Sequence, residues 1–226
     1  MRSFPSDQSR RAIQNDRRSL LGHSAGAMVV LAILSHTSVA QAAGASDPTA
    51  PIQQLNAALL AAMKAGQARP FTQRYAILAP AVERAFDLNT VLRAVVGLSW
   101  DSLPGDQKVA LAGTFQRYTI SEYTANFDGY DGQSFRILPQ TRPLPSGDVI
   151  VHTQIIRRDR SPVEIDYVMR HTAASWKAVD VLSDGTISQV AVQRSDFRRL
   201  LASGGVPALQ AGLQRKVASL SNGALG

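Results

Sequence analysis

The spacing of apolar residues changes twice along this chain, and this change restricts the fold more than any other feature of the sequence. Between residues 52 and 126, apolar side chains recur every three or four positions, which is typical of amphipathic helices. From about residue 135 to residue 182 they alternate with their neighbours, which is typical of strands, and after residue 195 the helical spacing returns. This order predicts an α+β fold in which N- and C-terminal helices pack on a curved antiparallel sheet of about four strands.

The boundaries of these elements follow from residues that start or end helices and strands. The helices expected before the sheet cover residues 52–65, 70–79, 86–97 and 104–126, and Pro80 is expected to end the second of them. The expected strands cover residues 135–138, 149–155, 163–169 and 176–182, with hairpin links at 158–162 and 170–175. A turn at Asp184 and Gly185 leads to helices at 195–202 and from 207, separated by Gly204 and Gly205.

The beginning of the chain carries the three parts of an export signal in their usual order. A basic segment with four arginines comes first, an apolar run follows, and Ala40-Gln41-Ala42 matches a signal peptidase site. A membrane anchor is the alternative, but Ser35, His36 and Thr37 interrupt a run that is short for a membrane span. Cleavage would divide the chain into a signal peptide at 1–42, a linker at 43–51, one domain at 52–221 and a tail at 222–226.

An arginine pair in the basic segment leaves two export routes open. Arg17 and Arg18 are followed by Ser19 and two leucines, which matches a twin-arginine signal. Ordinary secretion with a chance pair of arginines fits equally well. Both routes export the protein, and they differ in whether the chain folds before or after it crosses the membrane.

Charge and cysteine content exclude several classes of protein. The whole chain has a net charge of +7, but the first 42 residues hold five Arg and two Asp, so the charge of the remaining chain falls to +4. The remaining basic residues are dispersed, which argues against a nucleic-acid partner. The chain has no cysteine and therefore no disulfide, thiol nucleophile or thiolate metal site. We expect no metal and no cofactor.

The sequence after the signal lacks a set of residues typical of catalysis. Gly22-His23-Ser24-Ala25-Gly26 matches the nucleophile elbow of α/β-hydrolases, but it lies within the signal and lacks the strand that an elbow follows. His152 and His171 have no metal-ligand partner at a useful spacing. Glu164 and Asp166 alternate with apolar residues and are expected to point to solvent. We therefore expect a protein that is not an enzyme.

Large apolar side chains are abundant, and three interpretations of them stay open. A concave sheet covered by amphipathic helices can leave an apolar cavity, which is the usual setting for apolar ligands. An isomerase or cyclase-like enzyme with Asp166 or His152 in such a cavity is the second interpretation, because apolar surroundings can adjust the pKa of an acid. The third is an adaptor that binds other proteins and has a solid core without a pocket.

A set of residues spread over most of the chain resembles a known family. The resemblance runs from about Phe86 to Lys216 and is carried by Gly97, Trp100, Phe115, Tyr118, Tyr130-Asp131-Gly132, Tyr167, Trp176-Lys177, Asp180-Val181, Gly185, Ser188, Arg194, Phe197 and Gly204-Gly205. In this order and spacing they resemble the MlaC family of periplasmic phospholipid-binding proteins, also known as toluene-tolerance proteins or auxiliary components of ABC transport. The hopanoid-associated HpnM branch of that family is the most similar.

The resemblance implies a periplasmic protein that carries a lipid between membranes without a catalytic step. With the resemblance, the enzyme alternative becomes one of hopanoid or lipid metabolism, and the adaptor alternative becomes one that binds transporter proteins. It implies an apolar pocket between sheet and helices that holds acyl chains, an outer-membrane complex and an inner-membrane transporter as partners, and a role in outer-membrane lipid asymmetry. Arg194 and Asp196 would fix the corner into the last helical region. The expected lipid-binding residues are Phe115, Tyr118, Phe135, Val149, Val151, Ile165, Tyr167, Trp176, Val181, Phe197 and Leu213.

One departure from the family pattern leaves the ligand open between a phospholipid and a hopanoid. The family has a Gly-Val-Ser-Leu-Val run followed by Asn-Tyr-Arg, whereas this chain has Gly-Thr-Ile-Ser-Gln-Val at 185–190 and Val-Gln-Arg at 192–194. The departure fits the HpnM branch. A hopanoid is rigid and polycyclic, a phospholipid has two flexible tails, and the sequence does not choose between the two cavity shapes.

Overall fold

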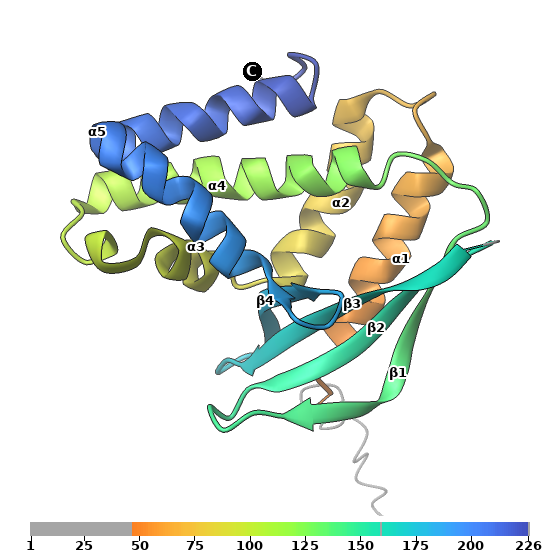
Figure 1. Cartoon of the computed structure of the whole chain (residues 1–226). Coiled ribbons are helices and arrows are strands. Elements are labelled where there is room, and N and C mark those ends of the chain that lie inside the picture. The colour runs from red at the N-terminus through yellow and green to blue at the C-terminus, as the bar shows by residue number, and fades with distance from the viewer. Residues whose placement is uncertain (1–46, 159, 226) are drawn as a thin grey trace, which may run out of the picture. The chain divides into compact units, whose positions relative to one another are not determined.

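A computed structural model describes residues 47–158 and 160–225 (Figure 1). The predicted signal peptide at 1–42 and the Gly-x-Ser-x-Gly motif within it lie outside the described residues. The elements in chain order are α1 (Ala50–Ala65), α2 (Phe71–Ala85), α3 (Leu88–Val96), η1 (Gly97–Trp100), α4 (Gly105–Asn126), β1 (Ser134–Pro143), β2 (Val149–Arg157), β3 (Arg160–His171), β4 (Trp176–Ser183), β5 (Ile187–Ser188) and α5 (Gln189–Leu220). This order of helices, strands and helix confirms the predicted α+β fold.

The sheet is an antiparallel meander in which each strand pairs with its neighbour in sequence. It has five strands because the two-residue β5 adds to the four that were expected. Val151 pairs with Tyr167, and Tyr167 pairs with Val181, so these three side chains share one face. Figure 1 shows the helices on one side of the sheet, with the first half of α5 reaching down to β4.

Buried apolar residues in the described part of the chain form two clusters. The first joins α1, α2 and the sheet and includes Leu55, Val82 and Met169. The second joins α3, α4 and α5 and includes Phe115 and Leu213. The helical and alternating spacings in the sequence therefore correspond to the faces that these elements bury. The site described below lies where the two clusters meet.

The prediction that Pro80 ends the second helix is wrong. Pro80 lies inside α2, which continues to Ala85. A proline inside a helix removes a backbone hydrogen bond and costs about 3 kcal/mol or more. The residues on both sides of it, Leu78, Ala81 and Val82, are almost fully buried in the first cluster. Tertiary packing of this face therefore outweighs the local cost.

The corner between β4 and α5 also differs from the prediction. The turn at Asp184 and Gly185 is present, with a positive φ at both residues and a hydrogen bond from the Thr186 amide to the Ser183 carbonyl. The helix, however, begins at Gln189 and not near Ser195, because the Ser188 hydroxyl accepts a hydrogen bond from the Ala191 amide and caps it.

Arg194 and Asp196 lie beyond this corner and do not fix it, contrary to the expectation. Arg194 packs against Gly97, where a Cβ would lie 2.8 Å from a guanidinium nitrogen. Asp196 instead faces Arg199 at 3.5 Å. The predicted interruption at Gly204 and Gly205 is confirmed, since both have non-helical backbone angles within α5.

A bidentate ion pair joins the start of β2 to the end of β3 and gives a first prediction. Arg170 donates to both carboxylate oxygens of the buried Asp148, at 2.9 and 2.7 Å. The Arg170 guanidinium holds the pKa of Asp148 below its usual 3.8. Since the folded-state pKa is the lower one, the pair stabilises the fold above pH 3.8 and loses that contribution as the pH falls through the folded value.

We expect Asp148→Asn to lower the free energy of unfolding by about 2 kcal/mol at neutral pH, measured by urea unfolding. The deficit should shrink in acid, where the wild-type carboxyl is protonated as well. Asp101→Asn is the matched control, because Asp101 also pairs with an arginine but both side chains are mostly exposed. It should change stability by less than about 1 kcal/mol. A deficit for Asp148→Asn that stays constant from neutral to acid pH would contradict the assignment.

Candidate functional site

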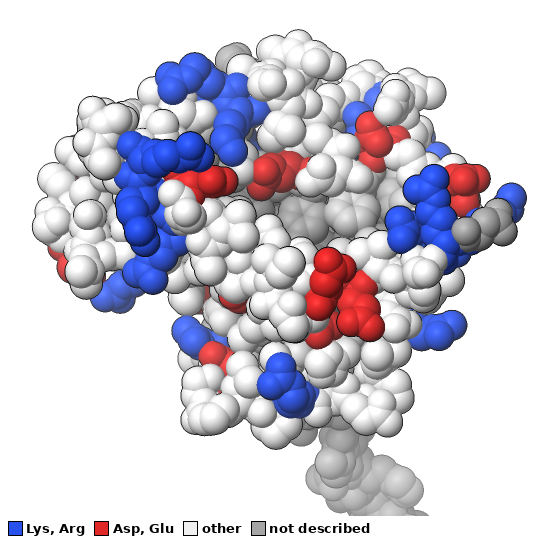
Figure 2. Space-filling view, in the orientation of Figure 1, with Lys and Arg blue, Asp and Glu red and all other residues white. Residues whose placement is uncertain are grey.

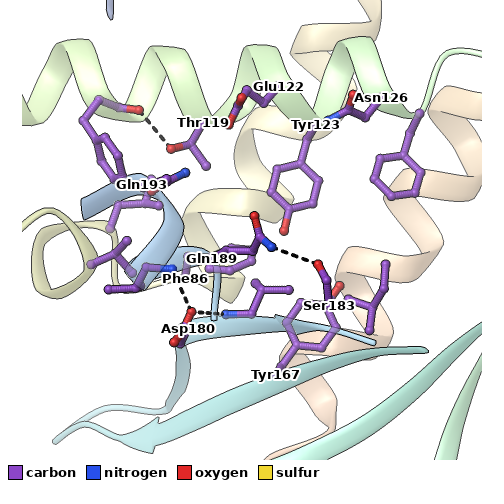
Figure 3. Close-up of a pocket in the computed structure, with 17 residues that line it drawn as sticks. Phe86, Thr119, Glu122, Tyr123, Asn126, Tyr167, Asp180, Ser183, Gln189 and Gln193 are labelled. Carbon is purple, nitrogen blue, oxygen red and sulfur yellow. Dashed lines mark hydrogen bonds between the residues drawn. The ribbon is translucent and has the colours of Figure 1, made fainter. Parts of the chain in front are cut away.

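A cavity of about 200 Å³ opens between the helices and the sheet, where the two apolar clusters meet (Figure 3). The walls come from the α2–α3 connection, α3, α4, β3, β4 and the first two turns of α5. The lining residues are Phe86, Leu88, Val91, Phe115, Thr119, Glu122, Tyr123, Asn126, Phe127, Ile165, Tyr167, Asp180, Val181, Ser183, Gln189, Val190 and Gln193. The walls are mainly apolar, and polar side chains are contributed by α4, β4 and α5.

One face of α4 supplies a wall in which aromatic and polar side chains are mixed. Its lining residues are spaced three or four positions apart from Phe115 onward, so they lie on one side of the helix. Tyr123 stacks on Phe127 at a ring separation of 6.0 Å and contacts Phe86 at 5.7 Å. Burial raises the pKa of Tyr123 and of Tyr167 well above the usual value. This aromatic wall is therefore uncharged at neutral pH.

Asp180 holds the first turn of α5 over the cavity. Its carboxylate accepts hydrogen bonds from the amides of Val181 and Val190, at 2.7 and 3.1 Å, and from the Ser188 hydroxyl. Gln189 adds a hydrogen bond of 2.9 Å to the Ser183 hydroxyl (Figure 3). These polar groups are satisfied within the protein, so they position a wall and are not free to bind a ligand.

Comparison with known proteins agrees with this architecture. Residues 53–215 match the family model described as MlaC protein. This chain belongs to the MlaC family. Its structure is similar to that of a phospholipid-binding protein from Ralstonia solanacearum, solved in complex with a phospholipid. The TM-score is 0.67 and the sequence identity 19%, and the match covers 78% of this chain and 99% of the other. A likeness at this identity shows the shared fold.

Four of the predicted lipid-binding residues of this MlaC family member line the cavity: Phe115, Ile165, Tyr167 and Val181. The others lie elsewhere. The cluster between α3, α4 and α5 buries Tyr118, Phe197 and Leu213. The cluster between the sheet, α1 and α2 buries Val151, and Phe135 and Trp176 pack against it. Val149 is half-buried in β2. Most of these side chains pack against other core residues, whereas Phe197 also lines a separate cavity beside α5. The binding role of the four lining residues stays a prediction.

The polar part of the lining was not predicted. The sequence interpretation selected large apolar residues, so it passed over Thr119, Glu122 and Asn126 on α4 and Gln193 on α5. A signal for the α4 residues was present, since they continue the helical spacing that starts at Phe115. The α5 residues had no such signal, because the helix was predicted to begin later.

Asp166 and His152 do not form an acid–base pair in the cavity of this MlaC family member. Asp166 was expected to point to solvent, but it is only 5% exposed, and that prediction is wrong. One of its oxygens lies 2.7 Å from Nδ1 of His152, and the other accepts a hydrogen bond from the Thr153 amide. His152 and Asp166 adjoin the inward-facing Val151 and Tyr167, so they lie on the opposite face of the sheet.

Two further searches of the described residues gave negative results. Residues 47–158 and 160–225 contain no group of three His, Asp or Glu residues placed to hold a metal ion. Within the same residues, no helix is long and apolar enough to cross a membrane.

Proposed function

We propose that this protein is a non-catalytic periplasmic lipid carrier that shelters the acyl chains of a phospholipid, or the ring system of a hopanoid, in the cavity between α4, α5 and the sheet. The observation that carries the proposal is a mainly apolar cavity between helices and sheet in a member of the MlaC family. The phospholipid bound by the Ralstonia protein, which shares this fold, supports it. The position of Asp166 and His152 on the other face of the sheet argues against the enzyme alternative.

The energetics explain why such a carrier needs an enclosed pocket. Removing a tail of about sixteen carbons from water gains roughly 0.8 kcal/mol per CH₂, or about 13 kcal/mol in total before entropy losses. A lipid therefore leaves a membrane slowly unless a protein offers it an equivalent environment. The carrier must also release the lipid, so its hold should match that of the membrane and not greatly exceed it.

The cavity is smaller than the 300–1,000 Å³ typical of ligand sites, so lipid entry requires a wall to move. We propose that the first half of α5 is that wall. It contributes Gln189, Val190 and Gln193 to the lining, and it is joined to the second half through the non-helical Gly204 and Gly205. The two glycines permit a change of backbone angle that would displace this wall, and the movement would have to break the hydrogen bonds of Gln189 and Val190 to β4.

The proposal also covers export of the protein, its partner complexes and the branch of the MlaC family to which it belongs. The basic segment, apolar run and Ala-x-Ala site in residues 1–42 support export to the periplasm with cleavage of a signal peptide. Family membership supports an outer-membrane complex and an inner-membrane transporter as donor and acceptor. The sequence at 185–194 favours the hopanoid-associated HpnM branch and therefore keeps a hopanoid among the candidate ligands.

The direct test is native mass spectrometry of the protein purified from its own periplasm without detergent. We expect about one lipid per protein molecule, and extraction would identify it as a phospholipid or a hopanoid. Purified protein should also take up lipid from vesicles. A mass equal to that of the bare polypeptide, together with no uptake from vesicles, would overturn the proposal in favour of the adaptor.

A further inference from the structure

The charged residues of the pocket lining are of one sign. Among the lining residues that the structure describes, Glu122 and Asp180 are acidic and none is basic. The chain as a whole has 24 basic and 17 acidic residues, so the lining departs from the overall composition. Figure 2 shows acidic side chains above and below the hollow at the centre of this face, while Lys and Arg gather to either side. Among the described lining residues, a ligand therefore meets carboxylates and no cationic side chain.

Glu122 has fewer partners within the protein than Asp180, since its carboxylate interacts with the Tyr118 hydroxyl and lies near the Lys216 ammonium. The Asp180 carboxylate is occupied by hydrogen bonds from the β4–α5 corner, as described above. Glu122 lies on the lining face of α4 between Thr119 and Asn126 (Figure 3). Burial raises the pKa of Glu122, although the neighbouring Tyr118 hydroxyl and the Lys216 ammonium lower it. A half-buried carboxylate of this kind gains from a cationic partner, which would favour its ionised form.

The groups that face Glu122 define what such a partner can be. Lys216 comes from the second half of α5, but its ammonium lies over the Tyr118 ring at 5.3 Å and lines a separate cavity together with Asp196 and Arg199. Lys216 is therefore close to Glu122 but is not one of the residues that line the lipid cavity. Asp196, from the first half of α5, adds a second negative charge near Glu122. A negatively charged head group near Glu122 would be repelled by these two carboxylates, and no basic residue of the lining would offset that repulsion.

We propose that Glu122 selects a lipid whose head group carries an ammonium and no net negative charge, as in phosphatidylethanolamine, over an anionic lipid such as phosphatidylglycerol. This inference rests on the proposed lipid-carrier function and specifies its ligand. The ammonium supplies both a charge and hydrogen-bond donors to the carboxylate. Phosphatidylglycerol has hydroxyl donors but no positive charge, and its net negative charge is repelled; repulsion of a competitor gives specificity as effectively as attraction of the correct ligand.

The test uses vesicles of phosphatidylethanolamine and phosphatidylglycerol in equal amounts, with identical acyl chains. The protein is incubated with them and re-isolated, and both bound lipids are quantified by mass spectrometry. Because both lipids are in one vesicle, attraction of the basic protein to the membrane surface is the same for each. We expect the wild type to hold about tenfold more phosphatidylethanolamine. Glu122→Gln should bring the ratio close to that of the vesicle.

Glu83→Gln is the matched control, because it removes the same charge from a carboxylate that lies outside the pocket and bonds to Gln116 at 2.6 Å. It should keep the wild-type ratio. Circular dichroism shows whether each variant is folded. A wild type that binds both lipids in the vesicle ratio, or a folded Glu122→Gln that keeps the preference, would overturn the inference while the carrier function stands. No uptake of either lipid by the wild type would overturn both.

A second vesicle pair distinguishes charge from hydrogen bonding. Phosphatidylcholine carries a cation without N–H donors, whereas phosphatidylglycerol has hydroxyl donors without a cation, so equal amounts of these two lipids test whether charge alone is enough for selection. A preference of the wild type for phosphatidylcholine that disappears in Glu122→Gln supports selection by charge. The absence of that preference, with phosphatidylethanolamine still favoured over phosphatidylglycerol, supports selection through the N–H donors of the ammonium.

Discussion

Replacing Val181 with tryptophan should reduce the lipid that co-purifies with the protein by about tenfold or more. Val181 lies on β4 next to its partner Tyr167, and its side chain lines the cavity. The cavity holds only about 200 Å³, so an indole directed into it would occupy much of the space that an acyl chain needs. Excess volume in a packed site costs about 1–3 kcal/mol, but Val181 is half-buried and faces a gap, so the fold should persist.

Leu98→Trp is the control for this substitution. Leu98 lies in η1 and is 96% exposed, so the same indole is added far from the lining. Lipid content is measured by extraction and mass spectrometry, and circular dichroism verifies the fold of both variants. We expect Leu98→Trp to retain wild-type lipid. A folded Val181→Trp with wild-type lipid content would mean that the lipid is bound somewhere else.

Phe197→Ala should lower the free energy of unfolding by about 3–5 kcal/mol. Phe197 is 1% exposed and lies where α4 and α5 pack together. Its ring contacts Phe115 edge-on at 6.3 Å and Tyr118 at 6.4 Å, and each aromatic pair adds about 0.5–1.5 kcal/mol beyond burial. The substitution therefore removes both apolar burial and two ring contacts, and it leaves a cavity that the surrounding helices can only partly close.

Urea unfolding measures this effect, and Leu98→Ala provides the control because an exposed leucine should contribute less than about 0.5 kcal/mol. The experiment also separates the two roles assigned to Phe197. The sequence placed it among the lipid-binding residues, whereas the structure places it in the core between helices. Unchanged stability together with a loss of bound lipid would return Phe197 to the pocket wall and contradict the packing described here.

The sequence by itself determined the class of fold and several of its boundaries. Apolar spacing reports which face of a helix or strand is buried, and this is why the α+β order was predictable. Asp184 and Gly185 form the expected turn because few other residues adopt a positive φ so readily. The interruption at Gly204 and Gly205 was predictable for a related reason, since glycine weakens a helix wherever it stands.

Whether a buried face lines a cavity or packs against another side chain depended on how the elements pack together. Phe115 and Phe197 both look like core residues in the sequence, yet only Phe115 reaches the pocket. Pro80 stays inside α2, and Asp166 is buried beneath His152, because neighbours distant in the sequence compensate a local cost. Glu122 becomes a candidate for head-group recognition only when α4 is placed against β4 and α5. Periodicity describes one element at a time, whereas a pocket is a gap between elements whose packing depends on all of them.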